Sequence, residues 1–169
     1  IKGMTLLDIG GGVGAIQHEL LRAGASRAIN VEASKAYIEA AKEEAERQGH
    51  ADRVSHHHGN FVDLAPDIPQ ADIVTLDRVI CCYHDMQALV GLSSVLARRF
   101  YGVVYPRDTW WVKIENAFSN FVYWIRHSSF RLFVHPTKAV DTMVRGNGLE
   151  RRFYREAGTW QVVVYARGK

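Results

Sequence analysis

A run of glycines near the start of the chain, followed further on by an acidic residue, has the composition of a nucleotide-binding loop. The apolar run Met4–Ile9 breaks into glycines, and apolar residues then recur at helical spacing between positions 15 and 21. Glycine permits positive φ and close approach of a ligand, and the next helix offers free N–H groups. Glu32 lies where an acid can bind ribose hydroxyls. The predicted binding residues are Gly10, Gly12, Gly14 and Glu32.

The rest of the chain alternates between strand-like and helix-like apolar patterns. Further strands are expected at Ala28–Val31, Arg53–His58, Ala71–Leu76, Phe100–Tyr105, Leu149–Arg155 and Trp160–Arg167. Helices are expected at Lys35–Gln48, over about a dozen residues ending at Ala97, at Thr109–Arg126 and at Thr137–Arg145. The alternation predicts one α/β domain over residues 1–169, a Rossmann-like, doubly wound, mostly parallel seven-stranded sheet. Because a short turn joins the last two strands, they must form an antiparallel hairpin.

The nature of the nucleotide depends on Asp8. The glycine pattern also fits a dinucleotide-binding fold, so an NAD-binding oxidoreductase is one alternative. Asp8 lies two residues before Gly10, where its negative charge would oppose a diphosphate. A cationic ligand suits this position better.

The run from Asp8 to Gly14, together with Glu32, resembles the first two cofactor motifs of class I S-adenosylmethionine-dependent methyltransferases. The resemblance implies S-adenosylmethionine, which carries a sulfonium and an ammonium group, as the cofactor. It also implies that Asn60 binds the adenine amino group beside Phe61, with Asp63 as the alternative. The cofactor-binding residues that it implies are Asp8, Gly10, Gly12, Gly14, Glu32, Ala33, Asn60, Phe61 and Asp77.

Two later stretches, Leu76–Tyr83 and Phe133–Pro136, resemble the branch that contains magnesium-protoporphyrin O-methyltransferases. The resemblance implies O-methylation of a small-molecule carboxylate or hydroxyl, with a porphyrin-like ring as one acceptor. The Asn/Asp-Pro-Pro-aromatic motif typical of amino-group methyltransferases is replaced here by Asp77-Arg-Val-Ile80. The Pro-Cys pair of cytosine C5 methylation is also missing, so Cys81 and Cys82 are expected to be small core residues.

The acceptor site is expected beneath an insertion at residues 106–136, whose aromatic helix forms one broad apolar stripe. We expect this stripe to pack on the core, with a roof over a flat acceptor as the alternative. A carboxylate acceptor is already ionised, whereas a hydroxyl acceptor would need a base nearby. The candidate catalytic residues are His135, His84 and Tyr83; Tyr105 is a further orienting hydroxyl, and Arg78, Arg107 and Arg131 are candidate anion contacts.

Charge is distributed unevenly along the chain. The net charge is +3, but residues 1–97 carry −5 and residues 98–169 carry +8. The basic half favours an anionic acceptor. It is also the one feature that supports a non-catalytic, nucleic-acid-binding member of the fold. Base-stacking motifs and a basic tail are missing, so we expect no nucleic-acid binding.

Several other partners are not expected from the sequence. The three histidines at 56–58 alternate faces in a strand, so no metal site is predicted. No apolar run approaches the roughly 20 residues of a membrane span. Two adjacent cysteines cannot form a disulfide framework, and a cytoplasmic location is expected. The chain begins without Met and almost directly on a strand, so a missing N-terminal segment is also expected.

Overall fold

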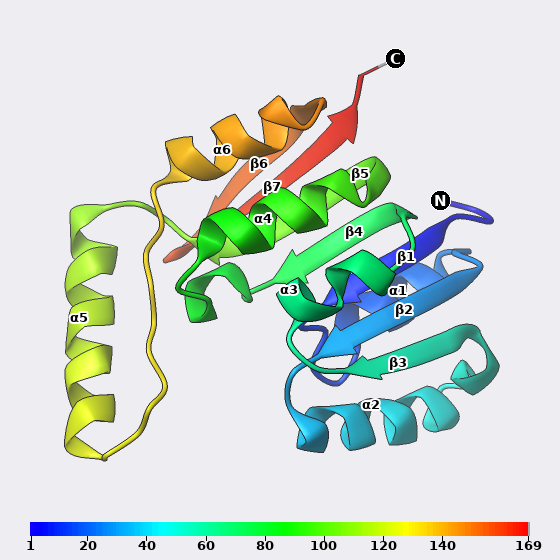
Figure 1. Cartoon of the computed structure of the whole chain (residues 1–169), viewed down its shortest axis with the longest axis horizontal. Coiled ribbons are helices and arrows are strands. Elements are labelled where there is room, and N and C mark those ends of the chain that lie inside the picture. Colours follow the sequence, from blue (N-terminus) through cyan, green and yellow to red (C-terminus); the bar gives the residue numbers. More distant parts are fainter. Residues whose placement is uncertain (169) are drawn as a thin grey trace.

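The computed structural model describes residues 1–168 and contains one seven-stranded sheet in the order β3-β2-β1-β4-β5-β7-β6 (Figure 1). The strands are β1 (Thr5–Ile9), β2 (Arg27–Glu32), β3 (Val54–His58), β4 (Ala71–Asp77), β5 (Ala97–Pro106), β6 (Leu149–Ala157) and β7 (Trp160–Arg167). Strands β1 to β5 pair in parallel, and β7 is antiparallel to both β5 and β6. The predicted fold class, including the C-terminal hairpin, is confirmed.

Six α-helices connect these strands within the described residues (Figure 1). They are α1 (Ala15–Arg22), α2 (Lys35–Arg47), α3 (Phe61–Leu64), α4 (Met86–Val95), α5 (Trp110–Ile125) and α6 (Thr137–Gly146). Side chains cap three of them: Ser34 Oγ accepts from Tyr37 N, Asn60 Oδ1 accepts from Val62 N, and Asp85 Oδ1 accepts from Ala88 N. The single-turn helix α3 was not predicted, since one turn leaves no apolar periodicity.

The two faces of the sheet pack against different helices, as the alternation of side chains along a strand requires. On one face Leu7 and Ile9 of β1 join a large core with α4 and α6. On the other face Leu6 packs with Leu21 of α1 and Ile73 of β4. No helix among the described residues is long and apolar enough to cross a membrane.

The boundary between α4 and β5 differs from the prediction. Helix α4 ends at Val95, and β5 begins at Ala97, three residues before the predicted strand. Ala97 pairs with Ala71 at the start of β4, and Ala71 N donates to Leu96 O. Ala97, which helical periodicity had assigned to the end of the helix, therefore belongs to the strand that pairs with β4.

The prediction that the stripe of α5 packs on the core is wrong. Val112 is the one buried residue of this helix, whereas Ile114 is 61% exposed and Phe118 is 67% exposed. The helix lies at one end of the molecule, and the return segment 128–135 runs beside it (Figure 1). Sequence periodicity identified the apolar face correctly but could not show which way that face would point.

Candidate active site

The glycine loop follows β1 and is held to β2. Gly10 N donates to Val31 O at 2.7 Å, and Gly10 has a φ of 62°. A Cβ atom on Gly10 would lie 2.5 Å from a methyl carbon of Val79, so a larger residue would force the two segments apart. Gly14, with a φ of 87°, is the residue before α1. The loop therefore requires glycine for both its conformation and its contacts.

Asp8 lies beneath this loop and not on the wall of a cavity. It is fully buried between Asn30 of β2 and Thr75 of β4, and Thr75 Oγ1 donates to Asp8 Oδ1 at 2.7 Å. Asp8 Oδ2 accepts no hydrogen bond from residues 1–168. Desolvation by burial raises the pKa of this carboxyl to about 7, although the bond from Thr75 opposes the shift. A Cβ atom on Gly11 would lie 2.7 Å from Asp8 Oδ2, so a glycine must cover it.

Glu32, at the end of β2, joins the glycine loop to the start of α2. Its Oε2 accepts from Gly12 N at 3.1 Å, and its Oε1 accepts from Ser34 N at 2.8 Å. A carboxylate has about four lone-pair sites on its two oxygens. Each oxygen of Glu32 can therefore still accept a hydrogen bond from a ribose hydroxyl.

A cavity of about 530 Å³ lies beyond the carboxyl ends of β1 and β2. In an open α/β sheet this is the edge at which ligands bind. Its wall contains Ile9, Gly10, Val31, Glu32, Ala33, Ser34, Tyr37, Gly59, Asn60, Phe61, Arg78, Val79, Cys82, Tyr83, Leu89 and Phe130. Five of the nine predicted cofactor-binding residues are on this wall: Gly10, Glu32, Ala33, Asn60 and Phe61.

The glycine-loop side of the cavity has the groups that an adenosyl ligand needs. Glu32 provides free lone pairs, and Asn60 and Phe61 follow β3 at the same edge. Asn60 Oδ1 already accepts from Val62 N at 3.4 Å as the N-cap of α3, and its amide donates to Asp63. Asp63 thus acts as a partner of Asn60 in this structure. The residues present fit a nucleoside cofactor.

The opposite side of the cavity is formed by Arg78, Cys82, Tyr83 and Phe130. Arg78 has a φ of 59°, a left-handed conformation that is uncommon for a residue other than glycine. It is the one candidate anion contact of the three that reaches this wall.

The two adjacent cysteines differ in exposure. Cys81 is buried, but Cys82 is exposed, so the prediction of two core cysteines is wrong for Cys82. The 3₁₀ turn at Ile80–Cys82 turns adjacent side chains in different directions.

The remaining candidate residues lie outside this wall. His135 Nε2 is 2.8 Å from the backbone oxygen of Tyr83, and the exposed His84 stacks on the Tyr83 ring. His135 therefore holds the turn that carries Tyr83 in place. Asp77 forms an ion pair with Arg78, with 3.4 Å between Oδ1 and Nε. Gly12 and Gly14 are in the loop but not on the wall.

Sequence reasoning did not identify Ser34 and Tyr37 as cavity residues. Both belong to the first turn of α2, which starts directly after Glu32. The assignment of Ser34 as an N-cap already placed this turn at the carboxyl edge of the sheet. The position of this turn could therefore have indicated that Ser34 and Tyr37 line the cavity.

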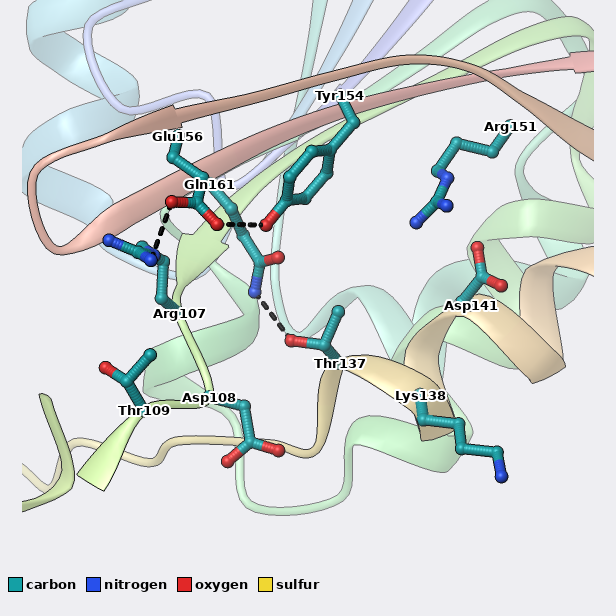
Figure 2. A pocket seen from close by; sticks show the side chains of 10 residues that line it. All are labelled: Arg107, Asp108, Thr109, Thr137, Lys138, Asp141, Arg151, Tyr154, Glu156 and Gln161. Carbon is teal, nitrogen blue, oxygen red and sulfur yellow. Dashed lines mark hydrogen bonds and ion pairs between the residues drawn. The ribbon is translucent and has the colours of Figure 1, made fainter.

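A second, polar cavity of about 540 Å³ lies between the β6–β7 hairpin and α6, and it shares no lining residue with the first (Figure 2). Arg107 is on its wall, but Glu156 pairs with this guanidinium at 2.6 Å, and Trp111 lies against it. Arg131 instead donates to the backbone oxygens of Ser128 and Phe130. All three candidate anion contacts are therefore already engaged within the chain, Arg78 through its longer ion pair with Asp77.

The part of the chain that the structure describes contains no cluster of metal-binding side chains. Within residues 1–168, no group of three or more His, Cys, Asp or Glu side chains is arranged to hold one. His58 is 3.1 Å from the backbone oxygen of Ala33, and His56 is partly buried on β3.

The chain is similar in sequence to known methyltransferases. Residues 2–98 match the model of the O-methyltransferase domain. Ribosomal protein L11 methyltransferase from Edwardsiella ictaluri is 32% identical over 104 residues, which cover 57% of this chain and 36% of that protein. The corresponding protein from Erwinia tasmaniensis is 32% identical over 110 residues, covering 61% of this chain and 38% of that one. The chain thus spans little more than a third of the length of these relatives.

Solved structures share the fold at low sequence identity. Magnesium protoporphyrin IX methyltransferase from Synechocystis PCC 6803, with bound S-adenosylhomocysteine, has a TM-score of 0.80 and 17% identity, covering 99% of this chain and 75% of that one. An O-methyltransferase family protein from Burkholderia thailandensis has a TM-score of 0.78 and 18% identity, covering 98% of this chain and 51% of that one. At these identities the likeness concerns the fold alone.

Proposed function

Because the chain belongs to the O-methyltransferase domain family, whose cofactor is S-adenosylmethionine, we propose that it methylates an oxygen atom of a small anionic or aromatic molecule. The family match covers the glycine loop, Glu32, Asn60 and Phe61. It supports the cofactor inferred from the sequence over the NAD alternative.

One observation carries the choice of acceptor. A single cavity combines the predicted nucleoside contacts Glu32 and Asn60 with a second group of residues, Arg78, Tyr83 and Phe130, on the other side. Arg78 and Tyr83 can bind a carboxylate or orient a hydroxyl, and Phe130 can pack on a flat ring. These side chains match the chemistry of an aromatic carboxylate better than that of an aliphatic amine.

The bound cofactor would supply an electrophilic methyl group, and the chain's residues would position the acceptor. Holding two reactants in line can lower the barrier by about 7–11 kcal/mol. An acceptor carboxylate needs no general base. The placement of His84 and His135 off the cavity wall is compatible with such an acceptor.

The role of Arg78 can be tested with a matched pair of variants. We expect Arg78→Gln to raise the KM for a carboxylate acceptor by about tenfold or more, since a charge-assisted hydrogen bond is worth about 1.5–3 kcal/mol. S-adenosylhomocysteine affinity should change much less. Arg99→Gln removes an exposed arginine outside this cavity and should leave both quantities unchanged. Equal KM values for the two variants would exclude the contact.

Acceptor identity requires a direct screen. Transfer of labelled methyl groups should be measured with aromatic carboxylates, a porphyrin carboxylate, phenols and ribosomal protein L11. We expect carboxylates or phenols to be labelled. Labelling of L11 alone would reject the small-molecule acceptor while keeping the methyltransferase activity, whereas failure to bind S-adenosylhomocysteine would reject both.

A further inference from the structure

Helix α5 is amphipathic, but its polar side packs against the rest of the chain and its apolar side faces outward. The side of the helix that faces the rest of the chain carries Asn120, whose amide donates to Leu132 O and whose oxygen accepts from Leu132 N, both at 2.8 Å. Tyr123, on the same side, packs edge-on against Phe130. The apolar side faces outward instead. An amphipathic helix of a monomer ordinarily buries its apolar face, so this exposed face needs a partner.

Five of the exposed apolar side chains of α5 recur at heptad spacing. Trp111, Phe118 and Ile125 occupy a positions, and Ile114 and Phe121 occupy d positions. We call these five residues the α5 seam. Trp110 and Trp124, at g positions, widen the exposed stripe along one side. Side chains at a and d positions are the ones that contact the partner when two helices pack side by side, so the spacing is compatible with a helical partner.

The order of residues in the α5 seam identifies which helix. Ile114, Phe118, Phe121 and Ile125 read the same in both directions, with three, two and three residues between them. If two copies of α5 lie antiparallel, Phe118 of one faces Phe121 of the other, and Ile114 faces Ile125. These two layers each pair residues of equal type around a two-fold axis, and Trp111 lies beyond them at the N-terminal end of the helix. The contacts are reciprocal, as an isologous interface requires.

We propose that α5 pairs antiparallel with α5 of a second copy of this chain, through the α5 seam.

The available area is sufficient for such a dimer. Six large side chains of α5 are more than half exposed: Trp110, Ile114, Phe118, Phe121, Trp124 and Ile125. Since a large aromatic side chain buries about 150–250 Å², these six offer on the order of 700 Å² per copy. A standard interface buries about 800 Å² per partner.

Charge does not oppose this pairing. Lys113 and Glu115 are the two charged residues within α5, and their signs cancel. A helix that lies on an anionic membrane usually has a basic polar face. The polar face of α5 instead carries Asn116, Ser119 and Asn120. The composition of the helix therefore favours a second copy over a lipid surface.

Sedimentation equilibrium at micromolar concentration tests the proposal. The unmodified chain should have twice the mass of one copy. Phe118→Glu should raise the dissociation constant at least 100-fold without changing the far-ultraviolet circular dichroism spectrum. Phe153→Glu, a matched change at an aromatic residue that is 49% exposed on β6, should leave the dimer intact. A monomeric unmodified chain, or a Phe118→Glu variant that still dimerises, would overturn the proposal.

The direction of pairing has its own test. In a mixture of Ile114→Cys and Ile125→Cys proteins, oxidation should link one variant to the other, and neither variant should link efficiently to itself. The unmodified chain controls for linkage through the exposed Cys82. Self-linkage of each variant would indicate parallel helices and contradict the proposal. Monomers that sediment with anionic lipid vesicles through the α5 seam would show that a membrane is the partner instead.

Discussion

Replacing Asp8 with Asn should change how the stability of the protein depends on pH. The carboxyl of Asp8 is fully buried, and burial raises its pKa from 3.8 to about 7. Because the folded pKa lies above the unfolded one, this group does not destabilise the protein at low pH, where both states are protonated. As pH rises from about 4 to about 7, the unfolded chain ionises this carboxyl while the folded chain keeps it protonated, so the free energy of unfolding falls.

The size of this stability change follows from the pKa shift of Asp8. Each pKa unit corresponds to about 1.36 kcal/mol, so Asp8 should cost the folded state about 3–5 kcal/mol above pH 7 relative to acid conditions. Asn has nearly the same shape and no charge. The difference in free energy of unfolding, Asp8→Asn minus the unmodified chain, should therefore increase by that amount between about pH 4 and pH 8.

Urea denaturation of both proteins across this pH range measures the effect. Asp72→Asn is the control with the opposite sign, because hydrogen bonds from Thr5 lower the pKa of Asp72. The contribution of Asp72 is present above its unfolded pKa and is lost as pH falls. If the stability curves of Asp8→Asn and the unmodified chain run parallel from pH 4 to 8, the Asp8 carboxyl is not buried as described.

Three further predictions concern the cofactor cavity. Gly10→Ala should abolish measurable S-adenosylhomocysteine binding in calorimetry and lower the melting temperature, because its Cβ would collide with Val79; unchanged binding would contradict the described loop. Glu32→Gln should weaken that binding by about tenfold or more and also destabilise the fold by about 1–3 kcal/mol, since its carboxylate accepts two backbone N–H groups. Cys82 should react with iodoacetamide faster than the buried Cys81, and S-adenosylhomocysteine should slow its reaction as followed by mass spectrometry; equal rates with and without ligand would place Cys82 away from the ligand.

Much of the fold could be predicted from local patterns. The strand, glycine loop and helix at the N-terminus follow from apolar spacing, and the antiparallel hairpin β6–β7 follows from the short turn at Glu156–Gly158. The end of α4 could not be predicted, because the pairing of Ala97 with Ala71 is a contact between distant segments. The outward direction of the α5 seam depends on tertiary contacts such as that between Asn120 and Leu132.

In the candidate site, too, some positions follow from local sequence and others depend on contacts between distant segments. Glu32, Asn60 and Phe61 follow strands directly, so the sequence was enough to predict that they meet at one edge of the sheet. The burial of Asp8 depends on Gly11 above it and on Thr75 beside it, which belong to other segments. The positions of His84 and His135 depend on a turn and an irregular segment with no periodicity, and sequence spacing could not place them relative to the cavity.

Phe130 is the single residue beyond position 98 on the wall of the cofactor cavity. The segment that matches the family model ends at residue 98, so the recognised part of the chain forms nearly the entire wall, and one ring from the return segment completes it. Because Arg78 and Tyr83 of the proposed acceptor side also lie within residues 2–98, one continuous stretch of chain builds both the nucleoside contacts and most of the acceptor contacts. Replacing residues 107–135 would change a single aromatic wall, Phe130, and leave the other contacts in place.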